Sequence, residues 1–346
     1  MDYSVVLGLT LVVVFFSSWL SLQRLHHVLM QLGCVALPSA RGLHSQPIPR
    51  GGGIVIALWG ILAIWLVPGS SDGSIYGYLL VAAGLLVVSL IGFADDRSNN
   101  LSTTTRLSVH FTASALVVAG CSIITALDAF VILGLPIIVV AVFLTIVGAW
   151  SINAMNFMDG SDALVASQVV LTTLIFNIFA LSNDIDLRHF AMLTVVGLST
   201  LGFLVKNLPP ATMFLGDVGS GFLGLAIVVF VITTTPAVWW SLPVALILYS
   251  LFIMDTFVTL SRRMLRGELP TNAHREHAYQ RIVQRSNRHA DALVVNTCYL
   301  LLVAVPLSFF TIHRDLTSVM AVVISFVLAG TLVLLTPSVS AQTQTR

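Results

Sequence analysis

The sequence predicts an all-α, polytopic membrane protein, with a single integral-membrane domain over residues 1–346. Hydrophobic residues make up 57% of the chain and charged residues 9%, against roughly a quarter charged in an average soluble protein. Charge-free apolar segments of about 20 residues, the length that crosses a bilayer, recur along the chain. Lys and Arg gather in alternate connections between these segments. Together these three features predict about eleven transmembrane helices.

Each apolar segment is bounded by charged residues, Gly or Pro, and each is expected to cross the membrane as a helix. The charge-free run 218–254 is too long for one crossing, so it is divided at Pro236 and Pro243. The expected helices cover residues 3–23, 51–68, 75–93, 107–127, 130–150, 163–183, 190–205, 218–236, 241–260, 292–312 and 317–336.

The basic residues orient these helices, because cytoplasmic loops retain Lys and Arg. With the N-terminus outside, fourteen of the sixteen Lys and Arg fall in cytoplasmic loops, and only Arg188 and Arg314 lie outside. An odd number of crossings places the C-terminus in the cytoplasm. The first segment lacks the basic start and cleavage pattern of a signal peptide and is expected to be a retained helix.

Two adjacent carboxylates, Asp95 and Asp96, stand at the end of the third segment and are followed by Arg97. Adjacent acids repel each other, and the C-terminal end of a helix is unfavourable for negative charge. Arg97, Arg106 or a divalent cation is expected to compensate them, since hard cations bind carboxylate oxygens. The alternative is a plain helix end.

The stretch NAMNFMDGSD places Asn153, Asn156, Asp159 and Asp162 three residues apart. On a continuous helix these side chains form one ridge, with a bend at Gly160. Capping of the next helix explains one such residue but not four. We therefore predict a polar site at the cytoplasmic end of the fifth segment.

The stretch FLGDVGSGFLG places Asp217 among Gly216, Gly219, Ser220 and Gly221 at the start of the eighth segment. Small residues let a ligand approach the backbone, and the N–H groups that begin a helix bind anions. Close helix packing explains the glycines but not the acid.

Two basic stretches are candidates for anion binding. In the longest cytoplasmic loop, NAHREHAYQR carries His274, Arg275 and His277, a combination that binds phosphate or a nucleotide. A solvated basic loop is the alternative. In SARGLHSQPIPRGGG, over residues 39–53, His44 and Arg50 precede three glycines, which is typical of a flexible anion-binding segment.

In their order and in their amino-acid sequences, these motifs resemble those of the polyprenyl-phosphate N-acetylhexosamine-1-phosphate transferases of glycosyltransferase family 4. That family includes the phospho-N-acetylmuramoyl-pentapeptide transferase and the enzymes that initiate O-antigen. The resemblance runs from HSQPIPRGG through GFADDR, the Asn153–Asp162 block and FLGDVGS to the histidine loop. That loop, HREHAY, departs from the His-x-His-His of many members and resembles the O-antigen-initiating branch.

The resemblance implies transfer of an N-acetylhexosamine 1-phosphate from a UDP-sugar to undecaprenyl phosphate, with release of UMP and with Mg2+, or Mn2+ in its place. It implies catalysis by Asp95, Asp96 and Asp159 and metal binding by Asp217 and Asp96. The reaction would take place at the cytoplasmic face of a bacterial inner membrane and initiate a surface polysaccharide such as O-antigen. The active loops would be 24–50, 94–106, 151–162, 206–217 and 261–291. Substrate binding is implied for His44, Arg50, Arg97, Arg106, Asn153, Asn156, Asp162, Gly216, Ser220, His274, Arg275 and His277.

Two other classes compete with this hypothesis. A transporter with an acidic ion pathway would bind its ion near the bilayer midplane. Only Asp255 lies within an expected helix, and an ion pair with Arg262 near the cytoplasmic end is the expected role for it. An intramembrane hydrolase with zinc on His274 and His277 leaves the Asp and Asn motifs without a role. No nucleic-acid partner is expected, and a homodimer remains open.

Overall fold

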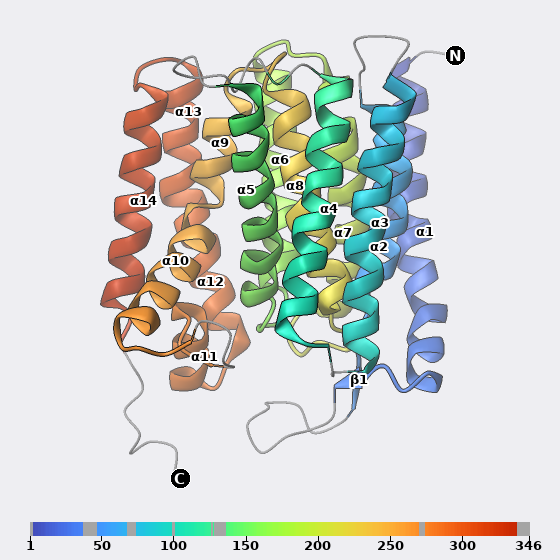
Figure 1. The fold of residues 1–346 in the computed structure, drawn as a ribbon, viewed down its shortest axis with the longest axis vertical. Coiled ribbons are helices and arrows are strands. Elements are labelled where there is room, and N and C mark those ends of the chain that lie inside the picture. Colours follow the sequence, from blue (N-terminus) through green and yellow to red (C-terminus); the bar gives the residue numbers. More distant parts are fainter. Residues whose placement is uncertain are drawn as a thin grey trace.

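The structure, a computed structural model, describes residues 3–36, 47–67, 74–98, 101–125, 127, 136–269 and 274–337. Within these ranges long helices run alternately up and down in one bundle (Figure 1). The helices are α1 (Tyr3–Gln31), α2 (Gly53–Ala63), α3 (Ser74–Ser98), α4 (Thr103–Ile124), α5 (Ile137–Met158), α6 (Leu164–Ser182), α7 (Ala191–Asn207), α8 (Gly216–Thr234), α9 (Ser241–Leu248), α10 (Ser250–Leu265), α11 (Ala278–Ser286), α12 (His289–Tyr299), α13 (Val305–Ile312) and α14 (Ser318–Leu335).

Shorter elements complete the described chain. The 3-10 turns η1 (Ile64–Leu66) and η3 (Leu187–Phe190) extend α2 and precede α7, and a π-helical turn, η4 (Leu300–Ala304), joins α12 to α13. A short antiparallel pair, β1 (Val35–Ala36) and β2 (Ile48–Pro49), lies at the end of the bundle where α1 ends (Figure 1).

The all-α, polytopic fold is confirmed. By length and composition, eight helices among the described residues are able to cross a membrane, or nine if the bent pair α9–α10 is one crossing. The expected number of eleven and the orientation of the termini stay predictions. In Figure 1, α1 begins at one end of the bundle and α14 ends at the other. The expected break is found between α8 and α9, with Pro236 between the helices and Pro243 in the first turn of α9. A further bend of 59° separates α9 from α10.

Helix α8 is the centre of the bundle, since every residue in it except Asp217 and Ile227 is buried. Glycines bring its first turns close to two other helices. A Cβ atom on Gly92 of α3 would lie 2.5 Å from the Asp217 oxygen, and one on Gly53 of α2 would lie 2.1 Å from the Gly219 Cα. Such small-residue contacts are typical of helices packed in membranes. They hold the start of α8 rigidly against α2 and α3.

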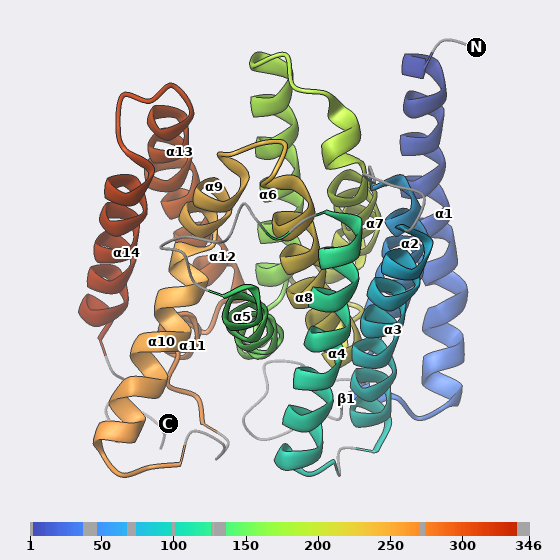
Figure 2. The ribbon, with the colours of Figure 1, turned by 45° about the horizontal axis from the view of Figure 1, so that its top comes forward.

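Helix α5 lies between α4 on one side and α10 on the other (Figures 1 and 2). The end of α3, the start of α4, the end of α5 and the start of α8 are all at the end of the bundle that also holds α11. The polar motifs of the sequence therefore share one end of the molecule.

Candidate active site

The end of α3 and the start of α4 bring opposite charges together. The Arg106 Nη1 atom lies 2.9 Å from the Asp95 Oδ2 atom and 3.8 Å from the Asp217 Oδ2 atom. The Asp95 and Asp217 carboxylates are therefore neighbours around this guanidinium group. Arg106 thus provides the compensating charge expected near the acidic pair, whereas Arg97 is exposed. Two carboxylates in this position share one guanidinium group.

The second acid of the pair, Asp96, caps α8. Its Oδ1 atom accepts a hydrogen bond of 3.0 Å from the Asp217 N–H, and its Oδ2 atom accepts one of 3.2 Å from the Val218 N–H. Gly216 has a φ of +78°, and a Cβ atom on it would lie 2.4 Å from the Asp96 Oδ2 atom. The expectation of a free anion site at this helix start is therefore wrong for these two N–H groups, because Asp96 already uses them.

The three glycines at the start of α2, Gly51 to Gly53, have a structural role. The N–H groups of Gly51 and Gly52 donate to the Phe214 oxygen at 3.2 and 3.0 Å, and the Gly53 N–H donates to the Leu215 oxygen at 3.0 Å. These three amides therefore bind the loop that leads into α8 and not an anion, while anion binding by His44 and Arg50 stays a prediction. The charge of Arg50 acts on the acids of the site, and His44 lies outside the described residues.

The predicted ridge on α5 is shorter than expected. The helix ends at Met158 and Asp159 is its C-terminal cap, so only Asn153 and Asn156 lie on one helical face. The Asn156 Nδ2 atom lies 3.4 Å from the Ser220 Oγ atom on α8. The continuous ridge is wrong because the chain turns after Met158 instead of bending at Gly160.

Beyond this turn, the two acids of the block have different surroundings. The Asp162 Oδ2 atom accepts a 3.0 Å hydrogen bond from the Ala211 N–H, which ties Asp162 to the loop before α8. Burial first, and then the neighbouring carboxylates of Asp217 and Asp96, raise the pKa of Asp159 well above its ordinary value. Asp159 therefore lies close enough to Asp96 and Asp217 for their charges to act on it.

One polar residue near the site was missed. His110 lies one turn after Arg106 on α4, is buried, and lies near Asn153 of α5. The Asn153 Nδ2 atom donates to the Ala149 oxygen at 2.7 Å. The spacing of Arg106 and His110 at i and i+4 was the signal that could have identified His110 from the sequence.

The loop between α10 and α12 contains a second polar cluster. The buried Asp255 accepts hydrogen bonds from the Ala278 N–H at 2.8 Å and the Tyr279 N–H at 3.4 Å. The Thr259 hydroxyl donates to it at 3.1 Å. The expected ion pair of Asp255 with Arg262 is wrong, because this carboxylate caps α11 instead.

The two histidines of this loop lie against the end of α5. The ring of Phe157 stacks on His277 with centroids 5.6 Å apart, and His274 lies 5.0 Å from His277. Burial, followed by His277 and Arg263, lowers the pKa of His274 to about 4. At neutral pH His274 is an uncharged imidazole, while Arg275 beside it is exposed. These histidines are joined to the Asp159 turn by ring contacts.

The donor set fits one kind of metal ion better than another. Among the described residues, no three His, Cys, Asp or Glu side chains are arranged to hold a metal ion. Catalytic zinc takes three protein ligands, whereas Mg2+ binds through one or two carboxylates together with water and substrate phosphates. Asp217 and Asp95 offer such a pair. Asp96 as a ligand stays a prediction.

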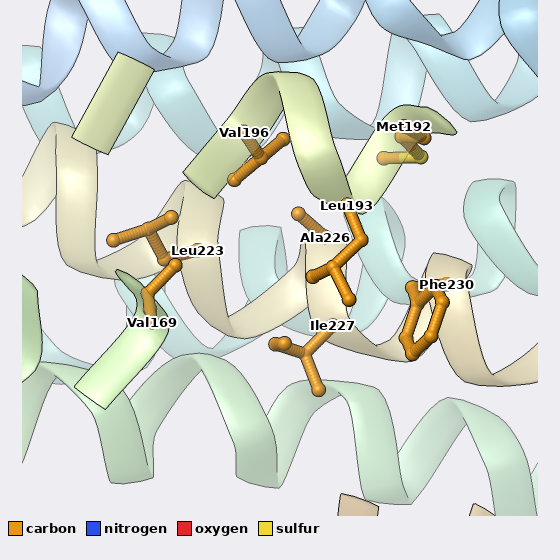
Figure 3. A pocket seen from close by; sticks show the side chains of 8 residues that line it. All are labelled: Val169, Met192, Leu193, Val196, Leu223, Ala226, Ile227 and Phe230. Carbon is orange, nitrogen blue, oxygen red and sulfur yellow. The ribbon is translucent and has the colours of Figure 1, made fainter. Parts of the chain in front are cut away.

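An apolar pocket lies deeper in the bundle, between α6, α7 and α8 (Figure 3). Its eight lining side chains, which include Val169, Leu193 and Phe230, carry no oxygen or nitrogen atom. Such a lining offers no hydrogen bond to a phosphate or a sugar. The polar end of the bundle is therefore the better candidate for a charged substrate.

Comparison with known proteins points to the same class of site. Residues 78–235, from α3 to the end of α8, match the model of glycosyl transferase family 4. The decaprenyl-phosphate N-acetylglucosaminephosphotransferase of Mycolicibacterium smegmatis is 28% identical over 303 residues, which cover 77% of this chain and 72% of that protein. A probable undecaprenyl-phosphate N-acetylglucosaminyl 1-phosphate transferase of Bacillus subtilis is 28% identical, covering 78% and 75%.

A third relative matches a shorter part of the chain. The phospho-N-acetylmuramoyl-pentapeptide-transferase of Streptococcus uberis is 29% identical over 167 residues, which cover 45% of this chain and 48% of that protein. The family match spans α3, α4, α5 and α8, the helices whose ends form the acidic site. Over residues 78–235 the chain is similar to glycosyl transferase family 4, and its relatives support a sugar-phosphate transferase.

Proposed function

We propose that this chain transfers an N-acetylhexosamine 1-phosphate from a UDP-sugar to a polyprenyl phosphate such as undecaprenyl phosphate, with release of UMP. The observation that carries the proposal is the meeting of four carboxylates and two guanidinium groups at one end of a membrane bundle: Asp95, Asp96, Asp159 and Asp217 with Arg50 and Arg106. The relatives are named for transfer of N-acetylglucosamine 1-phosphate with decaprenyl or undecaprenyl phosphate. The product would initiate a surface polysaccharide such as O-antigen.

The location of the site suits two substrates of opposite solubility. A polyprenyl phosphate keeps its chain in the bilayer and its phosphate at the boundary, while a UDP-sugar arrives from water. Carboxylates at helix ends lie where the two meet, and the distribution of Lys and Arg supports a cytoplasmic position. Labelling of a single cysteine at position 275 from the cytoplasmic side only, and at position 186 from outside only, tests this orientation.

In the proposed reaction an oxygen of the lipid phosphate attacks the sugar-proximal phosphorus of the UDP-sugar. The new P–O bond forms as the bond from that phosphorus to the bridging oxygen breaks, and UMP leaves with the electron pair. A phosphate monoester with a second pKa of about 6 is already largely dianionic at neutral pH, so it needs no base. Catalysis then depends on orientation and on charge.

The residues of the site divide this work. Arg106, held 2.9 Å from Asp95, and Arg50 supply positive charge for the phosphates. Asp217 and Asp95 would hold Mg2+, which supplies charge neutralisation for the diphosphate. Asp96 fixes the position of Asp217 through the start of α8. Asp159, at the C-terminal end of α5, lies near these acids and would orient the donor.

The test is a reconstituted assay. Purified protein in detergent or vesicles is incubated with undecaprenyl phosphate, Mg2+ and each of several UDP-N-acetylhexosamines, and release of UMP and formation of the lipid-linked sugar diphosphate are measured. UMP and lipid product in equal amounts are expected. Release of UMP without lipid substrate would indicate hydrolysis or a covalent aspartyl phosphate. Uptake of solute without UMP would support the transporter.

A further inference from the structure

We propose that Tyr279 is a positioning residue for Asp159, and that Gly160 is present because the Tyr279 hydroxyl occupies the space of a side chain there. The Tyr279 Oη atom donates a hydrogen bond of 2.8 Å to the Phe157 oxygen at the end of α5. Asp159 follows two residues later. This role rests on the proposed transferase reaction, in which Asp159 faces the reacting groups.

This hydrogen bond gives a partner to a carbonyl group at the C-terminal end of α5. The last carbonyl groups of an α-helix have no partner within the helix, and a buried carbonyl without a partner is costly. Helix α5 ends at Met158, so the Phe157 oxygen is one of these groups. The hydroxyl of Tyr279 satisfies it from a residue 122 positions away. The last turn of α5 is thereby fixed from outside.

Gly160 and Tyr279 fit each other closely. A Cβ atom on Gly160 would lie 2.2 Å from the Tyr279 Oη atom and 3.2 Å from its Cζ atom. The hydroxyl, and to a smaller degree the ring, thus excludes any side chain at position 160. A glycine in a turn is usually explained by its backbone, but here the neighbouring hydroxyl is a sufficient reason.

Tyr279 is itself held firmly. It is 5% exposed, and its N–H donates to the Asp255 Oδ2 atom at 3.4 Å. Its ring stacks on His277 at 6.0 Å, and His277 in turn stacks on Phe157 at 5.6 Å. Tyr279 is thus fixed by Asp255 of α10 and by His277, and its hydroxyl is bound to the end of α5. Through these contacts α10 and α11 determine the position of the turn that carries Asp159.

The first experiment removes one oxygen atom. Tyr279→Phe is expected to lower kcat about 2- to 10-fold, the equivalent of one net hydrogen bond, with KM for both substrates nearly unchanged. Tyr299→Phe is the matched control. Its hydroxyl is also buried between helices, donating to the Ser325 oxygen and meeting Ser250, both at 2.8 Å, but it lies in α12 away from the acidic site. The control is expected to keep the wild-type kcat.

The second experiment is a double-mutant cycle. Gly160→Ala alone is expected to lower kcat more than 10-fold, because the methyl group displaces the hydroxyl and the turn. In the pair Gly160→Ala with Tyr279→Phe the clash is reduced to the ring, so activity is expected within about threefold of Tyr279→Phe alone. Independent, multiplying losses would overturn the proposal.

A readout independent of activity separates this inference from the proposed function. Amide hydrogen exchange in the peptide 155–163 is expected to be faster in Tyr279→Phe and unchanged in Tyr299→Phe. Unchanged exchange, or a kcat loss that Tyr299→Phe reproduces, would overturn the role of Tyr279. If the wild-type protein releases no UMP while exchange changes as expected, the proposed reaction fails and the contact stands.

Discussion

Two polar clusters at the same end of the bundle balance their charges differently. In the acidic cluster, Asp95, Asp96, Asp159 and Asp217 face the guanidinium groups of Arg50 and Arg106. In the α10–α11 cluster, Asp255 is satisfied by two N–H groups and a hydroxyl, and Glu268 and Glu276 pair with Arg263 and Arg266. The first cluster has two more carboxyl groups than guanidinium groups, whereas in the second each glutamate pairs with an arginine and Asp255 is satisfied by hydrogen bonds.

The difference separates a binding site from a scaffold. Buried charges in a stable scaffold are paired, as the buried Arg263 is with Glu276 at 2.6 Å. Excess negative charge is retained where a cation or a substrate group completes the balance. Substitutions in the acidic cluster should therefore change activity more than stability, and those in the α10–α11 cluster the reverse.

The largest expected effect is that of Asp217→Asn. The change keeps the size of the side chain and removes a charge that a hard cation needs, so turnover should fall on the order of 100- to 1000-fold. Thermal stability without Mg2+ should be unchanged or higher, since one repulsive charge is gone. The assay is UMP release over a range of Mg2+ concentrations.

Its control lies at the opposite end of the bundle. Asp186 is paired with Arg188 at 2.5 Å in an exposed turn, and Asp186→Asn should leave turnover near the wild-type value. Near-normal activity of Asp217→Asn with the same Mg2+ dependence would show that Asp217 is not a metal ligand.

The sequence predicted the parts of the site that are encoded locally. Asp95 and Asp96 end a helix, and the Gly216–Asp217 pair begins one, because a glycine next to an acid after an apolar segment is a local signal. The errors involve partners far along the chain. Asp96 fills the start of α8, 121 residues away, and Asp255 caps α11, 23 residues away. No pattern within one segment contains that information.

The next effect in size is that of Gly216→Ala. A left-handed φ of +78° and a Cβ atom 2.4 Å from Asp96 combine strain with a clash against the cap of α8. Activity should fall at least about 10-fold, because Asp96 and Asp217 are displaced together. Gly267→Ala isolates the strain, since Gly267 has a φ of +75° but open space around a Cβ atom.

Gly267→Ala should lower stability by about 1 kcal/mol and leave turnover unchanged. Equal losses of activity in both variants would mean that backbone strain alone, and not the contact with Asp96, explains Gly216.

A smaller effect on activity is expected in the α10–α11 cluster. Asp255→Ala removes the acceptor of two N–H groups at the start of α11 and should lower stability by about 2 kcal/mol. The midpoint of thermal unfolding should fall, and the KM values of the remaining folded enzyme should change little. Asp255→Asn retains one oxygen acceptor and should lose less. A collapse of turnover at full stability would instead place Asp255 in the active site.

The smallest effect is expected from His274→Gln and concerns pH. Burial, His277 and Arg263 lower the pKa of His274 from 6.5 to about 4, with Glu276 and Glu268 acting in the opposite direction. The unfolded chain therefore binds a proton between about pH 6.5 and 4 that the folded chain does not, so stability falls as pH falls through this window. His274→Gln removes this linkage, and its unfolding midpoint should fall less between pH 7 and pH 5 than that of the wild type.

At pH 7 the neutral imidazole of His274 contributes no charge, so turnover of His274→Gln should differ from that of the wild type by less than about threefold. A much larger loss at pH 7, with unchanged stability, would restore the role in phosphate binding that the sequence predicted for His274.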